Sequence, residues 1–236
     1  MHDDIQYHTQ NWGKTVIAHF NNTRIGIIGV SGGHCIYNTP SSWWNSLIVS
    51  KNYIQRNYDP YDKVNSKISF YNHIKQDEDT EEVVAVDGFW FCIPKRLFST
   101  IYFDELTFKS FHFYDLDICF QIRKLGYSAH VIYDILIEHY SLGSINNDWI
   151  NSSILFNKKW NEQLPAIIGV ELSLNDYIVL CTKHVETELS YFKQLNQTEE
   201  RLNKIINSNA YKIGKLLLKP FAMFKSKAAA FKCRKS

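Results

Sequence analysis

The sequence predicts a mixed α/β fold for its larger part, followed by a helical extension. Two observations predict it. Apolar runs of strand length occur along the chain together with segments of helical character, and 45% of the 236 residues are hydrophobic and 15% aromatic. Disordered chains are poor in aromatic residues, so this composition indicates a folded protein. At this length we expect one domain with one sizeable core and some chain left over.

The first eighty residues are expected to hold one helix and one strand. The helix is predicted around Trp12–Phe20, and the strand at Arg24–Val30, an apolar run that ends in Ser-Gly-Gly. Residues 35–80 are rich in Asn, Ser, Tyr and Asp, which indicates a loop. The acidic run that follows, Asp77–Glu82, is expected to be a solvated surface turn.

The middle of the chain carries the strongest strand and helix signals. Residues 83–94 are continuously apolar except for Asp87 and Gly88, which predicts two buried strands, or one bent strand, around a tight turn. A helix is predicted from Tyr114 to Leu125, ending at Gly126, a favoured C-terminal cap. Two more strands and another helix are expected at residues 129–133, 135–140 and 146–160.

Charge is distributed unevenly along the chain. Residues 1–210 carry a net charge of −6, whereas residues 211–236 carry eight Lys or Arg and no acidic residue. Binding of nucleic acid by the body is therefore not expected, because phosphate contacts need clustered cations. For the tail, we expect docking on anionic membrane lipid, with Leu216–Leu218 and Phe221 inserted; the alternative is a flexible solubilising tail.

The composition also indicates the compartment. No run of about 18 apolar residues exists, and the N-terminus is acidic and polar, unlike a transmembrane helix or a signal peptide. Five widely spaced cysteines form no C-x-x-C pair, so neither a disulfide scaffold nor a zinc site is expected. We expect a cytoplasmic protein, held peripherally on the inner face of the membrane through its tail.

Two clusters, one at the N-terminus and one between apolar runs, carry groups suited to binding. His2, Asp3 and Asp4 place an imidazole beside two carboxylates, which can hold a hard divalent cation; the alternative is a solvated N-terminus. Asp87 and Gly88 lie between two apolar runs, where the glycine allows a ligand to approach the backbone; a purely structural turn is the alternative.

Two further clusters carry candidate catalytic groups. Asp115 and Asp117 fall at the predicted start of a helix among aromatic residues, where a carboxylate acquires a raised pKa and can act as a general base. The alternative is a role for either carboxylate in capping the helix. His139 directly follows an apolar strand and is a candidate ligand for a metal or phosphate, or a half-buried structural histidine.

These clusters occur in an order that resembles the bacterial glycosyltransferase-like family typified by streptomycin biosynthesis protein F, a branch of the GT-A nucleotide-sugar transferases similar to family 2. The resembling pieces are MHDDI (1–5), IGIIGVSGG (25–33), Trp43-Trp44, VDGFWFCIPKRLF (86–98), FDELTFKSFHFYDLDICFQIRKLGY (103–127), IEHYSLGS (137–144) and KKW…LP (158–165). A weaker likeness, SNAYKIGKLLLKPF at 208–221, matches the basic tails of bacterial sugar transferases.

The resemblance implies a role for each matching residue. Asp4 would bind the metal, Mg²⁺ or Mn²⁺, together with His139, and His2 and Asp3 would lie near the nucleotide. Asp87 and Gly88 would line the pocket for donor sugar and acceptor. Asp115 would be the catalytic base, while Tyr114 replaces the usual glutamate before it. With Asp117, Tyr114 completes the donor- and acceptor-binding set.

The resemblance therefore implies an inverting, metal-dependent glycosyltransferase of polysaccharide or glycoconjugate synthesis. It implies a UDP- or GDP-linked sugar donor and a glycan or lipid-linked acceptor. Residues 1–170 would form a GT-A-like core lacking the N-terminal nucleotide-binding half, residues 171–210 an amphipathic helical extension, and residues 211–236 the basic tail. The alternatives are an inactive fragment that serves as an interaction module, and a metal-dependent hydrolase.

Overall fold

The computed structural model describes residues 1–46, 48–57, 67–72, 79–141, 145–169 and 197–213, together with residues 173, 176, 178, 179 and 182. The chain divides into two compact units, residues 1–173 and residues 174–236. All strands formed by the described residues belong to the first unit.

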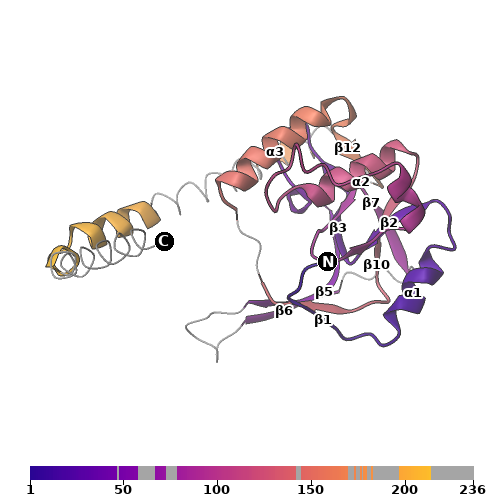
Figure 1. The fold of residues 1–236 in the computed structure, drawn as a ribbon, viewed down its shortest axis with the longest axis horizontal. Coiled ribbons are helices and arrows are strands. Elements are labelled where there is room, and N and C mark those ends of the chain that lie inside the picture. Colours follow the sequence, from indigo (N-terminus) through magenta and orange to yellow (C-terminus); the bar gives the residue numbers. More distant parts are fainter. Residues whose placement is uncertain are drawn as a thin grey trace, which may run out of the picture. The chain divides into compact units, whose positions relative to one another are not determined.

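The first unit is a mixed α/β structure (Figure 1). Its helices are α1 (Trp12–His19), α2 (Tyr114–Lys124) and α3 (Asn147–Lys159). Its strands are β1 (Ile5–Tyr7), β2 (Ile25–Gly29), β3 (Ser31–Gly33), β4 (Cys35–Ile36), β5 (Val49–Asn57), β6 (Lys67–Asn72), β7 (Thr80–Val83), β8 (Ala85–Val86), β9 (Phe91–Cys92), β10 (Ser128–Ile132), β11 (Ile137–His139) and β12 (Ala166–Ile167). Short 3-10 turns lie at Trp43–Asn45, Lys95–Ser99 and Asn161–Gln163.

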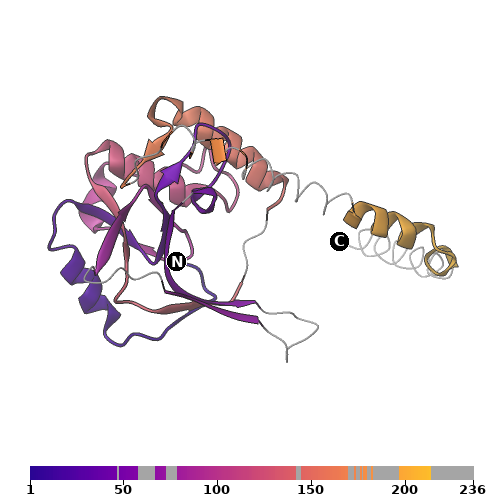
Figure 2. The ribbon, with the colours of Figure 1, turned by 180° about the vertical axis from the view of Figure 1, so that it is seen from behind.

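The strands form two larger sheets and one small one. One sheet has the order β1-β11-β5-β3-β8, with β6 paired to β5, and the other has the order β7-β10-β2-β9; β12 pairs with β4. The pairs β2–β10 and β5–β11 are parallel and the others are antiparallel, so both larger sheets are mixed. Figure 2 shows the long strands β5 and β6 side by side.

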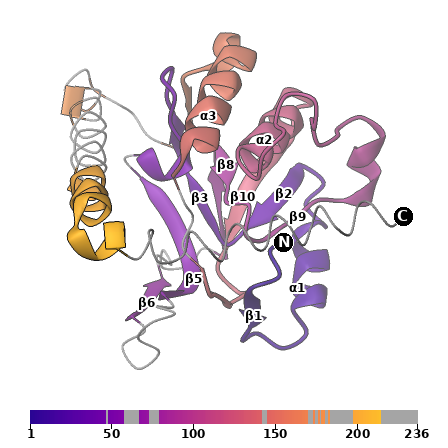
Figure 3. The ribbon, with the colours of Figure 1, turned by 60° about the vertical axis from the view of Figure 1, so that its left-hand side comes forward.

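Helices cover the sheets from two sides. Neighbouring residues of β2 point to opposite faces, so that Ile27 packs in the apolar cluster that contains residues of α2 and α3. Ile28 packs in a second cluster, against which Trp12 and Val16 of α1 lie. Figure 3 shows α2 beside β8, β10 and β2. This layered burial holds the strand ends that carry the polar clusters in fixed positions.

The predicted α/β class with a mixed sheet is confirmed. Helices α1, α2 and α3 and strands β2, β10 and β11 lie where the sequence predicts them. Gly126 follows α2 with a φ of +85°, the left-handed conformation expected of a C-terminal cap. The apolar run at residues 83–94 forms the end of β7 and the short strands β8 and β9, with a turn at Gly88–Phe89 that directly follows Asp87.

Two sequence predictions are wrong. The loop expected at residues 35–80 contains β4, β5 and β6, and β5 lies in the interior of its sheet. The solvated turn expected at Asp77–Glu82 is also wrong for its described part, since Thr80–Val83 forms β7 and Glu81 is buried. In addition, Ile5–Tyr7, ahead of the predicted first helix, forms the strand β1, which was not predicted and which pairs with β11.

Little of the second unit can be compared with the predicted extension. Residues 197–207 and 209–213 are helical, and Leu202, Ile205 and Ile206 are exposed. The residues of the predicted amphipathic stripe between 185 and 195, and residues 214–236 of the basic tail, lie outside the described part of the chain. The division of the extension into 171–210 and 211–236 stays a prediction. No helix that the described residues form has the length and apolar character needed to cross a bilayer.

Candidate active site

Strand pairing brings the first residues of the chain next to the strand that carries His139. β1 is antiparallel to β11, with Ile5 opposite His139, and the backbone N–H of Tyr140 donates to the carbonyl of Asp4 at 3.0 Å. The backbone N–H of His2 donates to the carbonyl of Phe89, in the turn between β8 and β9, at 2.8 Å. His139 is thereby placed beside His2 and Asp4, although it lies more than 130 residues from them in sequence.

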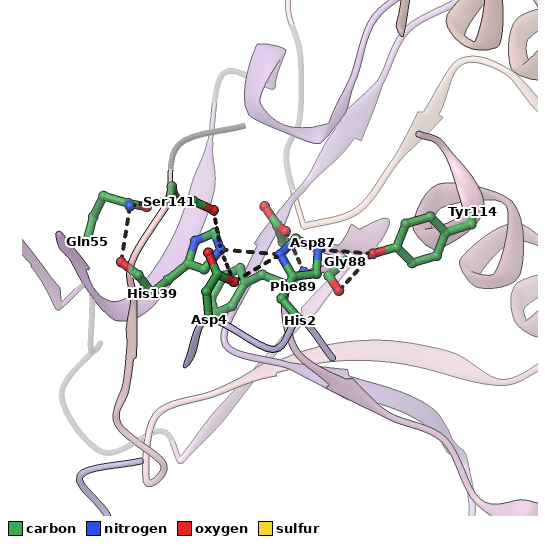
Figure 4. A network of polar contacts seen from close by, with 9 residues as sticks. All are labelled: His2, Asp4, Gln55, Asp87, Gly88, Phe89, Tyr114, His139 and Ser141. Carbon is green, nitrogen blue, oxygen red and sulfur yellow. Dashed lines mark hydrogen bonds and ion pairs between the residues drawn. The ribbon is translucent and has the colours of Figure 1, made fainter. Parts of the chain in front are cut away.

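The three side chains form a triangle of metal-ligating atoms (Figure 4). Asp4 Oδ1 lies 3.7 Å from His2 Nδ1 and 3.5 Å from His139 Nε2, and the two imidazole nitrogens are 3.3 Å apart. Ligands about 2.1 Å from one ion are separated by roughly 3 Å at neighbouring corners of its coordination shell. The donor set and its spacing therefore fit one divalent cation.

The surroundings keep these ligands in the form that binds metal. Burial lowers the pKa of both His2 and His139, so the imidazoles are neutral near pH 7 and their lone pairs are free to bind. Burial raises the pKa of Asp4, but a hydrogen bond from Ser141 and the two imidazoles outweigh it, and the net pKa is lowered. Asp4 is thus an anion at neutral pH.

Neighbouring residues fix the orientation of His139. Its ring stacks on Phe89, with the centroids 4.7 Å apart and an interplanar angle of 12°. Gln55, on β5, donates from Nε2 to the backbone carbonyls of His139 at 3.2 Å and Ser141 at 2.8 Å. Such contacts around a ligand hold it in position before metal binds.

A second group of polar residues lies directly beside the triangle. Tyr114, the first residue of α2, reaches the site with its hydroxyl, which lies 3.3 Å from His2 Nε2 and donates to the carbonyl of Gly88 at 3.0 Å. A Cβ atom on Gly88 would lie 2.5 Å from that hydroxyl and 3.1 Å from Asp115 Oδ2. Only glycine permits this close approach between the β8–β9 turn and the start of α2.

The close approach of the β8–β9 turn to the start of α2 also brings the carboxylates of Asp87 and Asp115 near each other. Burial raises the pKa of Asp115 to about 7, and the charge of Asp87 adds to the rise. Burial also raises the pKa of Asp87, to about 6, although the backbone N–H of Phe89 and the ammonium group of Lys51 hold it down. A carboxylate with a pKa near 7 exchanges protons readily at neutral pH, as a general base must.

The remaining predicted site residues lie apart from this arrangement. Asp3 is exposed, and its charge acts on His2. Asp117 is buried at the junction of α2 and α3, where its carboxylate forms an ion pair of 2.7 Å with Lys159 and accepts hydrogen bonds from Trp160 and Gln121. The structure therefore brings together His2, Asp4, Asp87, Gly88, Tyr114, Asp115 and His139, but not Asp117.

The structure adds residues that the sequence did not single out. Gln55 and Lys51 come from β5, which sequence patterns assigned to a loop, so nothing pointed to them. Ser141 and Phe89 lie inside the motifs already quoted, two residues after His139 and one residue after Gly88. This closeness in sequence was the only signal that pointed to them as site residues. His2, expected near the nucleotide, joins Asp4 and His139 in the group of side chains that could hold a metal ion.

Comparison with known proteins bears on the first unit. The model of a family described as "Glycosyltransferase like family" matches residues 1–163, which include every residue of the candidate site. No curated protein matches the chain.

Proposed function

Because the chain belongs to the glycosyltransferase-like family through residues 1–163, we propose that it transfers a sugar from a nucleotide-sugar donor to a hydroxyl group of its acceptor. The observation that carries the proposal is the triangle of His2, Asp4 and His139 beside a carboxylate, Asp115, whose pKa is raised to about 7. Transfer to an alcohol is favoured by a cation that stabilises the leaving diphosphate and by a base that accepts the proton of the attacking hydroxyl.

The proposed reaction inverts the configuration at the anomeric carbon of the sugar. Asp115 removes the proton from the acceptor hydroxyl as its oxygen forms a bond to that carbon. The bond from the carbon to the diphosphate oxygen breaks on the opposite face, and the nucleoside diphosphate leaves with the electron pair. His2, Asp4 and His139 would hold the divalent cation, Mg²⁺ or Mn²⁺, which supplies positive charge to the leaving diphosphate.

We further propose the finer features that the sequence suggests. The donor is UDP- or GDP-linked, the acceptor is a glycan or lipid-linked saccharide of cell-surface polymer synthesis, and Asp3 and Asp87 belong to the donor and acceptor region. The protein works at the inner face of the membrane, supported by the eight cations of residues 211–236. Its likeness to streptomycin biosynthesis protein F stays a prediction.

The test is a donor screen with the full chain. A panel of UDP- and GDP-sugars is incubated with Mn²⁺, with and without a mixture of bacterial glycans, and the released nucleoside diphosphate is measured. We expect release that requires the acceptor mixture. Release without acceptor would instead identify a hydrolase, and absence of donor binding by calorimetry would favour the interaction module.

The raised pKa of Asp115 predicts a pH profile. A general base must be ionised, so kcat/KM is expected to rise about tenfold per pH unit and to level off near pH 7. In Asp87→Asn the neighbouring negative charge is lost, so the pKa of Asp115 falls and the rising limb moves to lower pH. The pH dependence of single-turnover rates checks this, and a limb at the same pH in both proteins would contradict it.

Gly88→Ala is expected to reduce kcat/KM at least tenfold. The added Cβ would lie 2.5 Å from the Tyr114 hydroxyl, which must move and take the start of α2 with it. The matched control is Gly13→Ala in α1, where a Cβ meets no atom within 4 Å. That control should keep full activity and gain about 0.5–1 kcal/mol of stability. Equal activity of the two variants would show that the close approach at Gly88 is not needed.

A further inference from the structure

The segment between β9 and α2 exposes large apolar side chains. Leu106 is 87% exposed, Phe111 67% and Tyr102 63%, and Phe98 and Phe103 are also exposed. Figure 3 shows this segment as the magenta stretch beside α2, outside the sheet. Isolated exposed apolar residues are normal on protein surfaces, but five within fourteen consecutive residues mark a site of interaction. We call these five residues the apolar segment.

The apolar segment is continuous with the candidate active site. The ring of Phe111 lies 4.9 Å from that of His2 and 5.7 Å from that of Tyr114, measured between centroids. Phe103 lies 6.3 Å from Tyr114 and 6.0 Å from Phe98. A series of neighbouring aromatic rings thus leads from the metal-ligand triangle to the surface, and whatever covers the apolar segment lies beside the candidate site.

The side chains of this segment indicate a lipid surface. Phenylalanine and leucine enter the acyl boundary of a bilayer readily. Leu106, the most exposed of the five, has neither a polar atom nor a ring on which a sugar or a base could stack. The exposed cations Lys95, Arg96 and Lys109 flank the apolar residues. Of the two carboxylates between them, Asp104 is paired with Lys159 at 2.7 Å. Apolar side chains bordered by cations are complementary to anionic membranes.

We propose that the apolar segment docks the catalytic unit on an anionic lipid bilayer, with Phe98, Leu106 and Phe111 inserted at the headgroup boundary. The candidate site, which adjoins the segment, then lies close to the membrane, so that the acceptor is presented from the lipid surface. This docking goes beyond the proposed sugar transfer and is distinct from docking through the basic tail. It requires neither a donor nor turnover.

The test is sedimentation of the full chain with vesicles of phosphatidylethanolamine and phosphatidylglycerol, compared with vesicles of phosphatidylcholine alone. Leu106→Asp is the main variant, because this side chain is almost fully exposed and its replacement leaves the fold intact. Ile17→Asp on α1, at a residue 68% exposed, is the matched control. Both variants retain the basic tail, so any contribution from residues 211–236 is the same in each.

We expect Leu106→Asp to bind the anionic vesicles at least tenfold more weakly than the unaltered chain, and Ile17→Asp to bind as the unaltered chain does. Replacing Lys95, Arg96 and Lys109 together by Glu should weaken binding as strongly at low salt and less at high salt. Equal binding by the Leu106 and Ile17 variants would overturn the proposal. Unchanged vesicle binding with reduced use of a soluble glycan would assign the segment to the acceptor and also overturn it. Asp115→Asn should bind vesicles normally, which separates this test from that of the transfer reaction.

Discussion

Asp115→Asn is expected to abolish sugar transfer and, above pH 7, to stabilise the fold. Loss of a general base typically costs a factor of 10² to 10⁴ in rate, and an amide cannot accept the acceptor's proton. Burial beside Asp87 raises the pKa of Asp115 to about 7. The raised pKa favours catalysis, but the buried negative charge also destabilises the folded protein. Replacing the carboxylate by an amide therefore removes both the activity and this destabilisation.

The direction of the stability effect follows from the raised pKa. A carboxyl group whose pKa is higher in the folded than in the unfolded chain binds its proton more tightly when folded. Its favourable contribution is complete below the unfolded pKa of 3.8 and is lost as the pH rises through about 7. The ionised carboxylate then destabilises the fold by up to about 4 kcal/mol, at 1.36 kcal/mol per pKa unit. Asparagine avoids this cost at every pH.

The measurement is the free energy of unfolding at pH 5 and pH 8, with single-turnover rates on the same proteins. Asp117→Asn is the matched control, two residues along the same helix. Its buried carboxylate pairs with Lys159 and accepts hydrogen bonds from Trp160 and Gln121. Lys159 keeps its second partner, Asp104, so the loss of the charge should destabilise the fold by about 1–3 kcal/mol. If Asp115→Asn destabilised the fold at pH 8 as Asp117→Asn does, the assignment of Asp115 as a strained base would be wrong.

The sequence was sufficient for elements whose side-chain pattern is local. Gly126 marks the end of the helix at 114–124. The strand at 25–29 is apolar throughout, and the strand at 128–132 is mostly apolar. Asp87, Asp115 and His139 were identifiable because each lies at the end of such an element. Their mutual positions were implied only through family resemblance, since no spacing in the sequence places residue 4 beside residue 139.

Strand β5 was missed because its polar residues have partners that only the fold supplies. Asn52 is buried and donates from Nδ2 to the backbone carbonyls of Tyr133 and Ile135, at 2.9 and 3.0 Å. Gln55 does the same for the strand that carries His139. Polar residues that hydrogen-bond to neighbouring backbone can be buried without penalty, so a polar composition does not by itself indicate a loop. Lys51 and Gln55 could not be predicted as site residues for the same reason, because only the fold supplies their partners.

Replacement of His139 or His2 is expected to change which metal ion supports transfer. The triangle offers two imidazoles and one carboxylate, a softer set than the carboxylates and carbonyls that suit Mg²⁺. We therefore expect Mn²⁺ to support at least tenfold higher kcat/KM than Mg²⁺ at equal concentration. His139→Asp should narrow or reverse that preference, while His139→Ala should weaken Mn²⁺ binding at least a hundredfold.

Metal binding can be followed without turnover, through the loss of the free Mn²⁺ signal in electron paramagnetic resonance as protein is added. His19→Ala is the matched control, because His19 pairs with Asp134 and belongs to α1, away from the triangle. One bound Mn²⁺ per chain, lost in His2→Ala, Asp4→Asn and His139→Ala but retained in His19→Ala, is the expected result. Equal binding in all four variants would place the cation elsewhere. The assignment of His2, Asp4 and His139 as ligands of the cation would then be wrong.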